Sequence, residues 1–174
     1  NRKTKCACCG NIYEWQDQTM EIVPFDTEYL KNYKTDELLE EVLKYKNFIS
    51  KGGGGVTATG GEPLVQAEFL ASFFQKCHDK GIHTALDTSG AIFNEKVKQL
   101  LLHTDLVLLD IKFWNDESYL EYTGKSIKNT LDTLDFLESI GKRTVIKTVV
   151  VPGINDNRET LEKYLQIIRG KKCV

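Results

Sequence analysis

The sequence lacks any long apolar run: no hydrophobic stretch approaches the roughly 20 residues that a helix needs to cross a bilayer. It also lacks a basic excess, because 23 Lys and Arg stand against 25 Asp and Glu, for a net charge of −2. Proteins that bind nucleic acid or an anionic membrane surface usually carry a positive patch. We therefore expect no nucleic acid and no membrane as partner, and a cytoplasmic location.

Histidine is scarce, with three in 174 residues. His83 and His103 border expected strand or helix ends, and His78 lies on a polar helical face. None is placed like a metal ligand or a general base. We accordingly expect that no side chain acts as an acid or base catalyst.

The cysteine pattern does not suit a disulfide framework. Five cysteines are present, and Cys6, Cys8 and Cys9 fall within four positions. An odd number with one tight cluster favours metal or redox chemistry in a reducing compartment. Thiolates on a polar loop such as residues 1–15 can hold an iron–sulfur cluster, but this spacing also serves zinc or copper sites and plain reduced cysteines. The spacing alone leaves these alternatives open.

The stretch that stands out, residues 51–63, reads KGGGGVTATGGEP. A short β-favouring run at residues 56–59 is followed at once by Gly60 and Gly61, which have no Cβ. In sheets with helical crossovers ligands bind at the carboxyl ends of the strands, where bare backbone allows close approach. Glu62 adds one carboxylate. A plain turn between strand and helix is the alternative interpretation.

The rest of the pattern predicts one α/β domain over residues 1–174. Three more strands are expected at residues 82–90, 106–112 and 143–152. Amphipathic or helix-like segments cover residues 35–49, 66–80, 96–103, 116–140 and 160–169, with Thr35 as a possible cap of the first. Strands that alternate with helices indicate a parallel sheet with right-handed crossovers.

Polar residues gather where the expected strands end. Glu62 follows the first strand, Asp87 and Thr88 end the second, and Asp110 and Lys112 end the third. In a curved parallel sheet these ends converge on the face that is catalytic in β/α barrels. Each residue alone is explained as a helix cap or a surface charge, but three successive carboxylates favour a shared site. Lys147 lies within the fourth strand, where simple alternation points its side chain outward.

Five segments together resemble one known family: GGGVTATGGEP, QAEF, GIHTALDTSG, DLVLLDIK and VVVPG. They are similar to the radical S-adenosylmethionine (SAM) activating enzymes of glycyl radical enzymes, and most of all to those that act on pyruvate formate-lyase. The similarity runs from about residue 6 to residue 153. It implies a partial parallel (β/α) barrel, with the first and last strands of the family fold expected outside residues 1–174 and residues 1–15 as the cluster-binding loop.

The resemblance also implies site residues. Cys6 and Cys9 match the second and third cysteines of the family motif C-x3-C-x2-C, Arg2 stands where the first would be, and Cys8 is an alternative [4Fe–4S] ligand. A second, overlapping set of matches would contact the SAM cofactor, and three of these residues, Asp87, Thr88 and Asp110, would also lie near a monovalent cation. These cofactor-binding matches are Cys8, Cys9, Gly10, Gly60, Gly61, Glu62, Asp87, Thr88, Asp110, Ile111 and Lys112.

The family chemistry gives the expected function. A reduced [4Fe–4S] cluster cleaves SAM, and the resulting radical abstracts hydrogen from a glycine of pyruvate formate-lyase, with an electron donor such as flavodoxin. Three alternatives remain: an activase of another glycyl radical enzyme, an inactive fragment that only binds an adenosyl ligand, and a zinc or copper thiolate site.

Overall fold

The computed structural model describes residues 31–174, in which four strands form one parallel sheet. The strands are β1 (Gly55–Ala58), β2 (His83–Thr88), β3 (Leu106–Asp110) and β4 (Thr144–Lys147). Each strand pairs with the next, in the order β1-β2-β3-β4. A doubly wound sheet reverses its strand order, whereas a β/α barrel keeps it, so this sheet has the order of a barrel segment. The predicted parallel α/β fold is confirmed.

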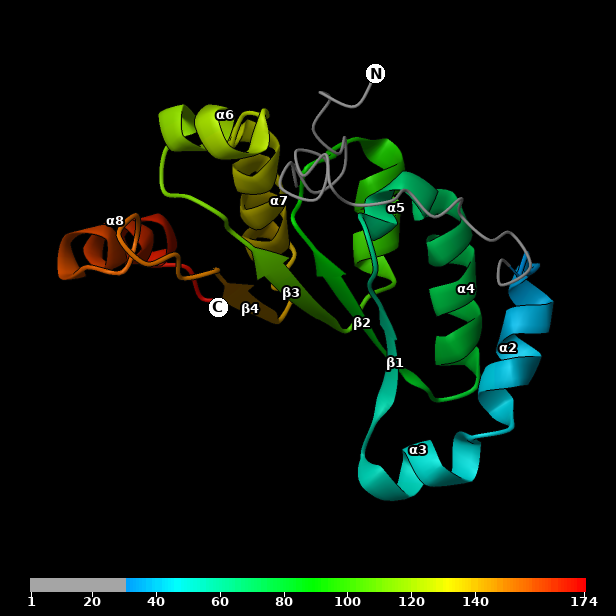
Figure 1. Cartoon of the computed structure of the whole chain (residues 1–174). Helices are drawn as coiled ribbons and strands as arrows, with labels where there is room; N and C mark the ends of the chain where they lie inside the picture. The colour runs from blue at the N-terminus through cyan, green and yellow to red at the C-terminus, as the bar shows by residue number, and fades with distance from the viewer. Residues whose placement is uncertain (1–30) are drawn as a thin grey trace, which may run out of the picture.

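Helices connect and flank the strands. They are α2 (Thr35–Leu43), α3 (Lys46–Gly52), the short 3₁₀ helix η2 (Pro63–Gln66), α4 (Ala67–Asp79), α5 (Glu95–Leu102), α6 (Asp116–Thr123), α7 (Lys128–Ser139) and α8 (Arg158–Ile168). Figure 1 shows α4, α5 and α7 together on one side of the sheet, with α8 beyond β4. Among residues 31–174, no helix has both the length and the apolar character required to span a bilayer.

Among residues 31–174, one face of the sheet packs into the hydrophobic core. Side chains alternate along a strand, and Leu86, Val107 and Leu109, which share one face, are all completely buried. They join fully buried residues of the covering helices, namely Phe74, Cys77, Val97, Leu100, Leu101 and Leu137. Burying an apolar side chain of this kind contributes about 1.5–3 kcal/mol. The opposite face, which carries Asp87, Leu108 and Asp110, stays partly exposed.

Asparagine side chains set the start of three helices. Asn94, Asn115 and Asn157 each accept a hydrogen bond from the backbone N–H three residues later, at 3.1, 2.9 and 3.0 Å, at the starts of α5, α6 and α8. The expected cap at Thr35 is wrong. Thr35 is already inside α2, and its hydroxyl accepts a hydrogen bond from Lys76 Nζ at 2.9 Å.

Two helices expected to be continuous are each divided. The 116–140 segment breaks after α6 because Gly124 takes a left-handed conformation with φ of 72°, which ends the helix. The 35–49 segment breaks between α2 and α3, and Phe48 is 83% exposed. The apolar pattern therefore overestimated how far the buried face of this segment extends.

The fourth strand is shorter than expected. The apolar pattern predicted residues 143–152, but β4 ends at Lys147, opposite Asp110 of β3. The last ladder bond runs from the Ile111 N–H to the Lys147 carbonyl at 2.9 Å. Because β3 ends here, residues 148–150 have no β3 residues to pair with, and Val149 and Val150 are 59% and 62% exposed.

One pair of variants tests the one-sided core. Leu109→Ala removes a fully buried side chain, so we expect the free energy of unfolding to fall by about 2–5 kcal/mol. Leu108→Ala, on the partly exposed face of the same strand, serves as the control and should cost clearly less. Urea denaturation of this chain measures both. Equal losses would contradict the assignment of the two faces.

Candidate functional site

The three predicted polar clusters lie together at one edge of the sheet. Parallel pairing places all the carboxyl ends on the same side, with Thr88 opposite Leu109 and Asp110 opposite Lys147. Counting by alternation along the paired strands, the side chains of Asp87, Asp110 and Lys147 project from the same, partly exposed face. This face is the one turned away from the covering helices, so charged groups can meet a ligand there.

Glu62 joins the ends of β1 and β2. Its side chain is buried, at 5% exposure, and both of its carboxylate oxygens are occupied. Oε1 accepts from the Leu64 N–H at 3.1 Å and from the Thr88 hydroxyl at 2.6 Å. Oε2 accepts from the N–H and the hydroxyl of Ser89, at 3.1 and 2.5 Å. Glu62 is therefore a bracket between two loops, and its carboxylate is not free to face a ligand.

The glycine pair before Glu62 presents open backbone. Gly60 has a φ of 126°, a conformation that other residues rarely adopt. A Cβ at Gly60 or Gly61 would meet no other heavy atom within 4 Å. Packing within the protein therefore does not explain why position 61 is a glycine. The bracket by Glu62 holds this uncovered backbone next to the end of β2.

Asp87 is held by a residue that sequence reasoning left out of the site. Lys147 Nζ lies 2.7 Å from each of the two carboxylate oxygens of Asp87. Lys147 does alternate outward, as expected, and the outer face that it reaches is the one that carries Asp87. Lys147 lies on β4 opposite Asp110 of β3, and β3 separates it from Asp87 of β2. Its long side chain therefore reaches across β3 to Asp87. The side chains are 41% and 26% exposed, so the pair lies at the surface of the open face.

Asp110 has one oxygen bound and one without a partner. Oδ2 accepts from Lys112 Nζ at 2.8 Å. Oδ1 is buried and forms no hydrogen bond with any residue of the described part of the chain. A buried acceptor without a partner costs free energy and calls for an explanation.

Two tyrosines hold the backbone of Lys112. The Lys112 N–H donates to the Tyr119 hydroxyl at 3.0 Å, and the Tyr164 hydroxyl donates to the Lys112 carbonyl at 2.8 Å. Burial raises the pKa of Tyr119 to about 12, which keeps its hydroxyl neutral. The neighbouring Ile111 has its side chain in the core at 1% exposure, so any ligand contact from it has to come from its backbone.

The expected cluster loop cannot be placed. Cys6, Cys8, Cys9 and Gly10 lie outside the described residues 31–174. Within the described residues, no group of three or more His, Cys, Asp or Glu side chains is arranged to hold a metal ion.

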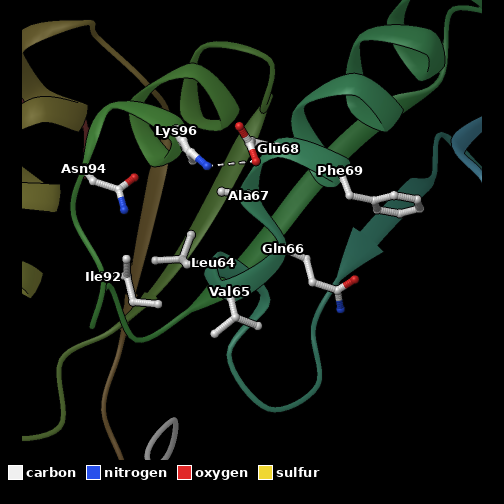
Figure 2. A pocket seen from close by; sticks show the side chains of 9 residues that line it. All are labelled: Leu64, Val65, Gln66, Ala67, Glu68, Phe69, Ile92, Asn94 and Lys96. Carbon is white, nitrogen blue, oxygen red and sulfur yellow. Dashed lines mark ion pairs between the residues drawn. The ribbon is translucent and has the colours of Figure 1, made fainter.

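A separate cavity of about 350 Å³ lies beside η2 and the starts of α4 and α5. Figure 2 shows Lys96 joined to Glu68, at 2.9 Å, above the apolar side chains of Leu64, Val65 and Ile92. None of the carboxylates at the strand ends lines this cavity. Its two charged side chains, Lys96 and Glu68, neutralise each other, so the strand-end edge is the better candidate site.

Comparison with known proteins identifies the family. The sequence profile of the Radical SAM superfamily matches residues 3–165. The chain belongs to the radical SAM superfamily. Enzymes of this superfamily use a [4Fe–4S] cluster and S-adenosylmethionine.

Similar curated radical SAM proteins carry one functional name. The pyruvate formate-lyase-activating enzyme of Clostridium pasteurianum is 42% identical over 144 residues, which are 83% of this chain and 60% of that protein. The pyruvate formate-lyase 1-activating enzyme of Escherichia coli K12 is 36% identical over 167 residues, 95% of this chain and 64% of that protein. The chain thus spans less than two thirds of the length of these relatives.

Solved structures confirm the radical SAM fold. A domain of the pyruvate-formate lyase-activating enzyme from Bacteroides vulgatus superposes with a TM-score of 0.62 at 24% identity, over 68% of this chain and 74% of that one. Streptococcus suis SuiB, in a structure bound to S-adenosylmethionine, gives 0.63 at 14% identity over 80% of this chain and 32% of SuiB. The expected partial barrel is confirmed by these similarities.

The bracket can be tested by one conservative change. Glu62→Gln keeps the shape of the side chain but replaces one acceptor oxygen by an NH₂ group, which would face a donor it cannot pair with. We expect the free energy of unfolding to fall by about 1.5–3 kcal/mol, the range for hydrogen bonds to a charged group. Chemical denaturation measures this loss.

The matched control is Glu68→Gln, six residues further along, where an exposed carboxylate faces Lys96. An exposed ion pair contributes little, so this variant should keep nearly the original stability. Equal losses of stability in the two variants would contradict the role of Glu62 in holding the two loops together.

Proposed function

We propose that the chain is the SAM-binding part of a pyruvate formate-lyase activating enzyme. The proposal rests on the curated relatives, whose names agree, and on the chemistry of the strand-end edge. The single observation that carries it furthest is the buried Asp110 Oδ1 at the end of β3, which has no partner within the described part of the chain. A polar ligand with a donor group would satisfy this oxygen.

The residues at the edge fit SAM as a ligand. Its methionine end carries an ammonium and a carboxylate, and its ribose carries two hydroxyls. The open backbone at Gly60 and Gly61 can receive the ammonium through carbonyl oxygens. Asp110 can accept a hydrogen bond, and Lys112 beside it can face a carboxylate. The set thus offers backbone acceptors for the ammonium, one carboxylate acceptor for a further donor, and a cation for the carboxylate of the ligand.

The cluster ligands that we propose are Cys6 and Cys9, with Cys8 as the alternative third thiolate, all outside the described residues. A [4Fe–4S] cluster, once reduced by an external donor, supplies the electron that splits SAM and so allows hydrogen abstraction from a glycine. The part of this chain is to bind and orient SAM and to limit access of water. This division of labour agrees with the expected lack of an acid or base catalyst.

The partner in this proposal is pyruvate formate-lyase, whose glycine has to reach the open edge of the sheet. An activase of another glycyl radical enzyme would need the same edge, because hydrogen abstraction takes place beside SAM in both cases. A flavodoxin is our proposed electron donor, and the cytoplasm our proposed compartment. The near-neutral net charge of the chain agrees with a location in the aqueous cytoplasm.

Formation of 5′-deoxyadenosine tests the activity. The protein is reconstituted anaerobically with iron and sulfide and then given SAM and a strong reductant. We expect product in the original protein and none in the double variant Cys6→Ala/Cys9→Ala. Adding pyruvate formate-lyase should then give the doublet of a glycyl radical in its electron paramagnetic resonance spectrum.

Other outcomes separate the alternatives. A bound cluster without product would contradict the activity, and retained SAM binding in that case would indicate a module that only binds an adenosyl ligand. Zinc or copper without sulfide would indicate a thiolate metal site. Product without a radical on pyruvate formate-lyase would favour a different glycyl radical enzyme. Arg2, at the position of the first family cysteine, makes Arg2→Cys an informative companion variant.

A further inference from the structure

The open face of the sheet carries two carboxylates and two ammonium groups. Lys147 bonds to both oxygens of Asp87, and Lys112 bonds to one oxygen of Asp110. The four side chains come from the ends of β2, β3 and β4 and the residues just beyond. Positive and negative charges are thus matched within the site before any ligand arrives.

This arrangement does not fit the monovalent cation that family resemblance implies beside Asp87, Thr88 and Asp110. Hard cations take several oxygen ligands at once. Here both oxygens of Asp87 already face an ammonium group. The Thr88 hydroxyl donates to Glu62 and accepts from the Gly90 N–H at 3.0 Å. Of the three side chains, Asp110 alone has an oxygen without a partner among residues 31–174, Oδ1.

We propose that the ammonium group of Lys147 serves as the built-in cation at Asp87 and takes the place of a bound alkali metal ion. The charge is the same, and a contact of 2.7 Å to both oxygens is as close as a charge-assisted hydrogen bond allows. Ligand binding at this edge then requires no added Na⁺ or K⁺.

A stabilising role explains the Lys147–Asp87 pair less well than a role as a built-in cation. Lys147 is 41% exposed, and ion pairs at such positions contribute little to the free energy of folding. The pair does control the local charge: without Lys147, two carboxylates would face one ammonium group, and a cation would be drawn to the site. Lys147 is a positioning residue in this scheme, because it acts on the ligand through Asp87.

The first test needs no cofactor. Thermal unfolding of the protein is followed in NaCl, KCl and choline chloride at equal ionic strength. We expect the same melting temperature in all three for the original protein. Lys147→Met keeps an unbranched side chain, one atom shorter, without its charge. It should melt about 2–4 °C higher in NaCl or KCl than in choline chloride, because a metal ion now binds the folded state.

The control variant is Lys142→Met, which removes a partly buried ammonium group just before the other end of β4, where Lys142 Nζ contacts the Leu102 carbonyl at 3.4 Å. It should melt at the same temperature in all three salts. The proposal is overturned if the original protein is stabilised by Na⁺ or K⁺ as much as Lys147→Met is. It is equally overturned if Lys147→Met folds but shows no difference between salts.

The second test measures the dissociation constant of SAM with the reconstituted protein, and it rests on the proposed function. We expect less than a twofold difference between choline and Na⁺ or K⁺ for the original protein. Lys147→Met should bind about tenfold more weakly in choline and recover most of this loss in Na⁺ or K⁺. A lack of SAM binding in every salt would contradict the proposed function. The melting temperatures would still decide the role of Lys147.

Discussion

Parallel pairing of the four strands is the constraint on which the site depends. Because every crossover returns the chain to the same end of the sheet, residues up to 85 positions apart in sequence, from Glu62 to Lys147, share one edge. Helices α4, α5 and α7 bury the other face, and this burial supplies the stability that permits one face to remain polar. The edge is thus supported by a rigid core and is itself open.

The three carboxylates at this edge, Glu62, Asp87 and Asp110, differ in their electrostatic contacts and therefore in their roles. Glu62 is buried and has its oxygens filled by donors of the protein, so it shapes the loops around it. Asp87 is balanced by Lys147, and Asp110 keeps one oxygen without a partner. Three acidic residues that look equivalent in the sequence therefore differ in role: Glu62 links two loops, Asp87 is a paired charge, and Asp110 has a buried oxygen without a partner among residues 31–174. Their surroundings decide which is which.

Much of the fold could be predicted because its signals are local. Apolar runs such as residues 106–109, glycine at strand and helix ends, and the order of strands and helices identify the parallel sheet. The errors also have local causes: the apolar pattern did not register the left-handed turn at Gly124, nor the end of β4 where its partner strand ends. Ser89 had a usable signal, since it directly follows Asp87 and Thr88 in a strand-end polar cluster. Tyr119 and Tyr164 had none.

The sequence by itself determined the type of sheet, the polar clusters that follow the first three strands, and the family, because glycine pairs and short motifs depend on neighbours along the chain. Tertiary structure alone decided the partners of each charge. Whether Lys147 faces Asp87 depends on the register between β3 and β4, and a shift by one residue would turn it to the other face. That register is set by packing across the whole sheet, which no local stretch of sequence encodes.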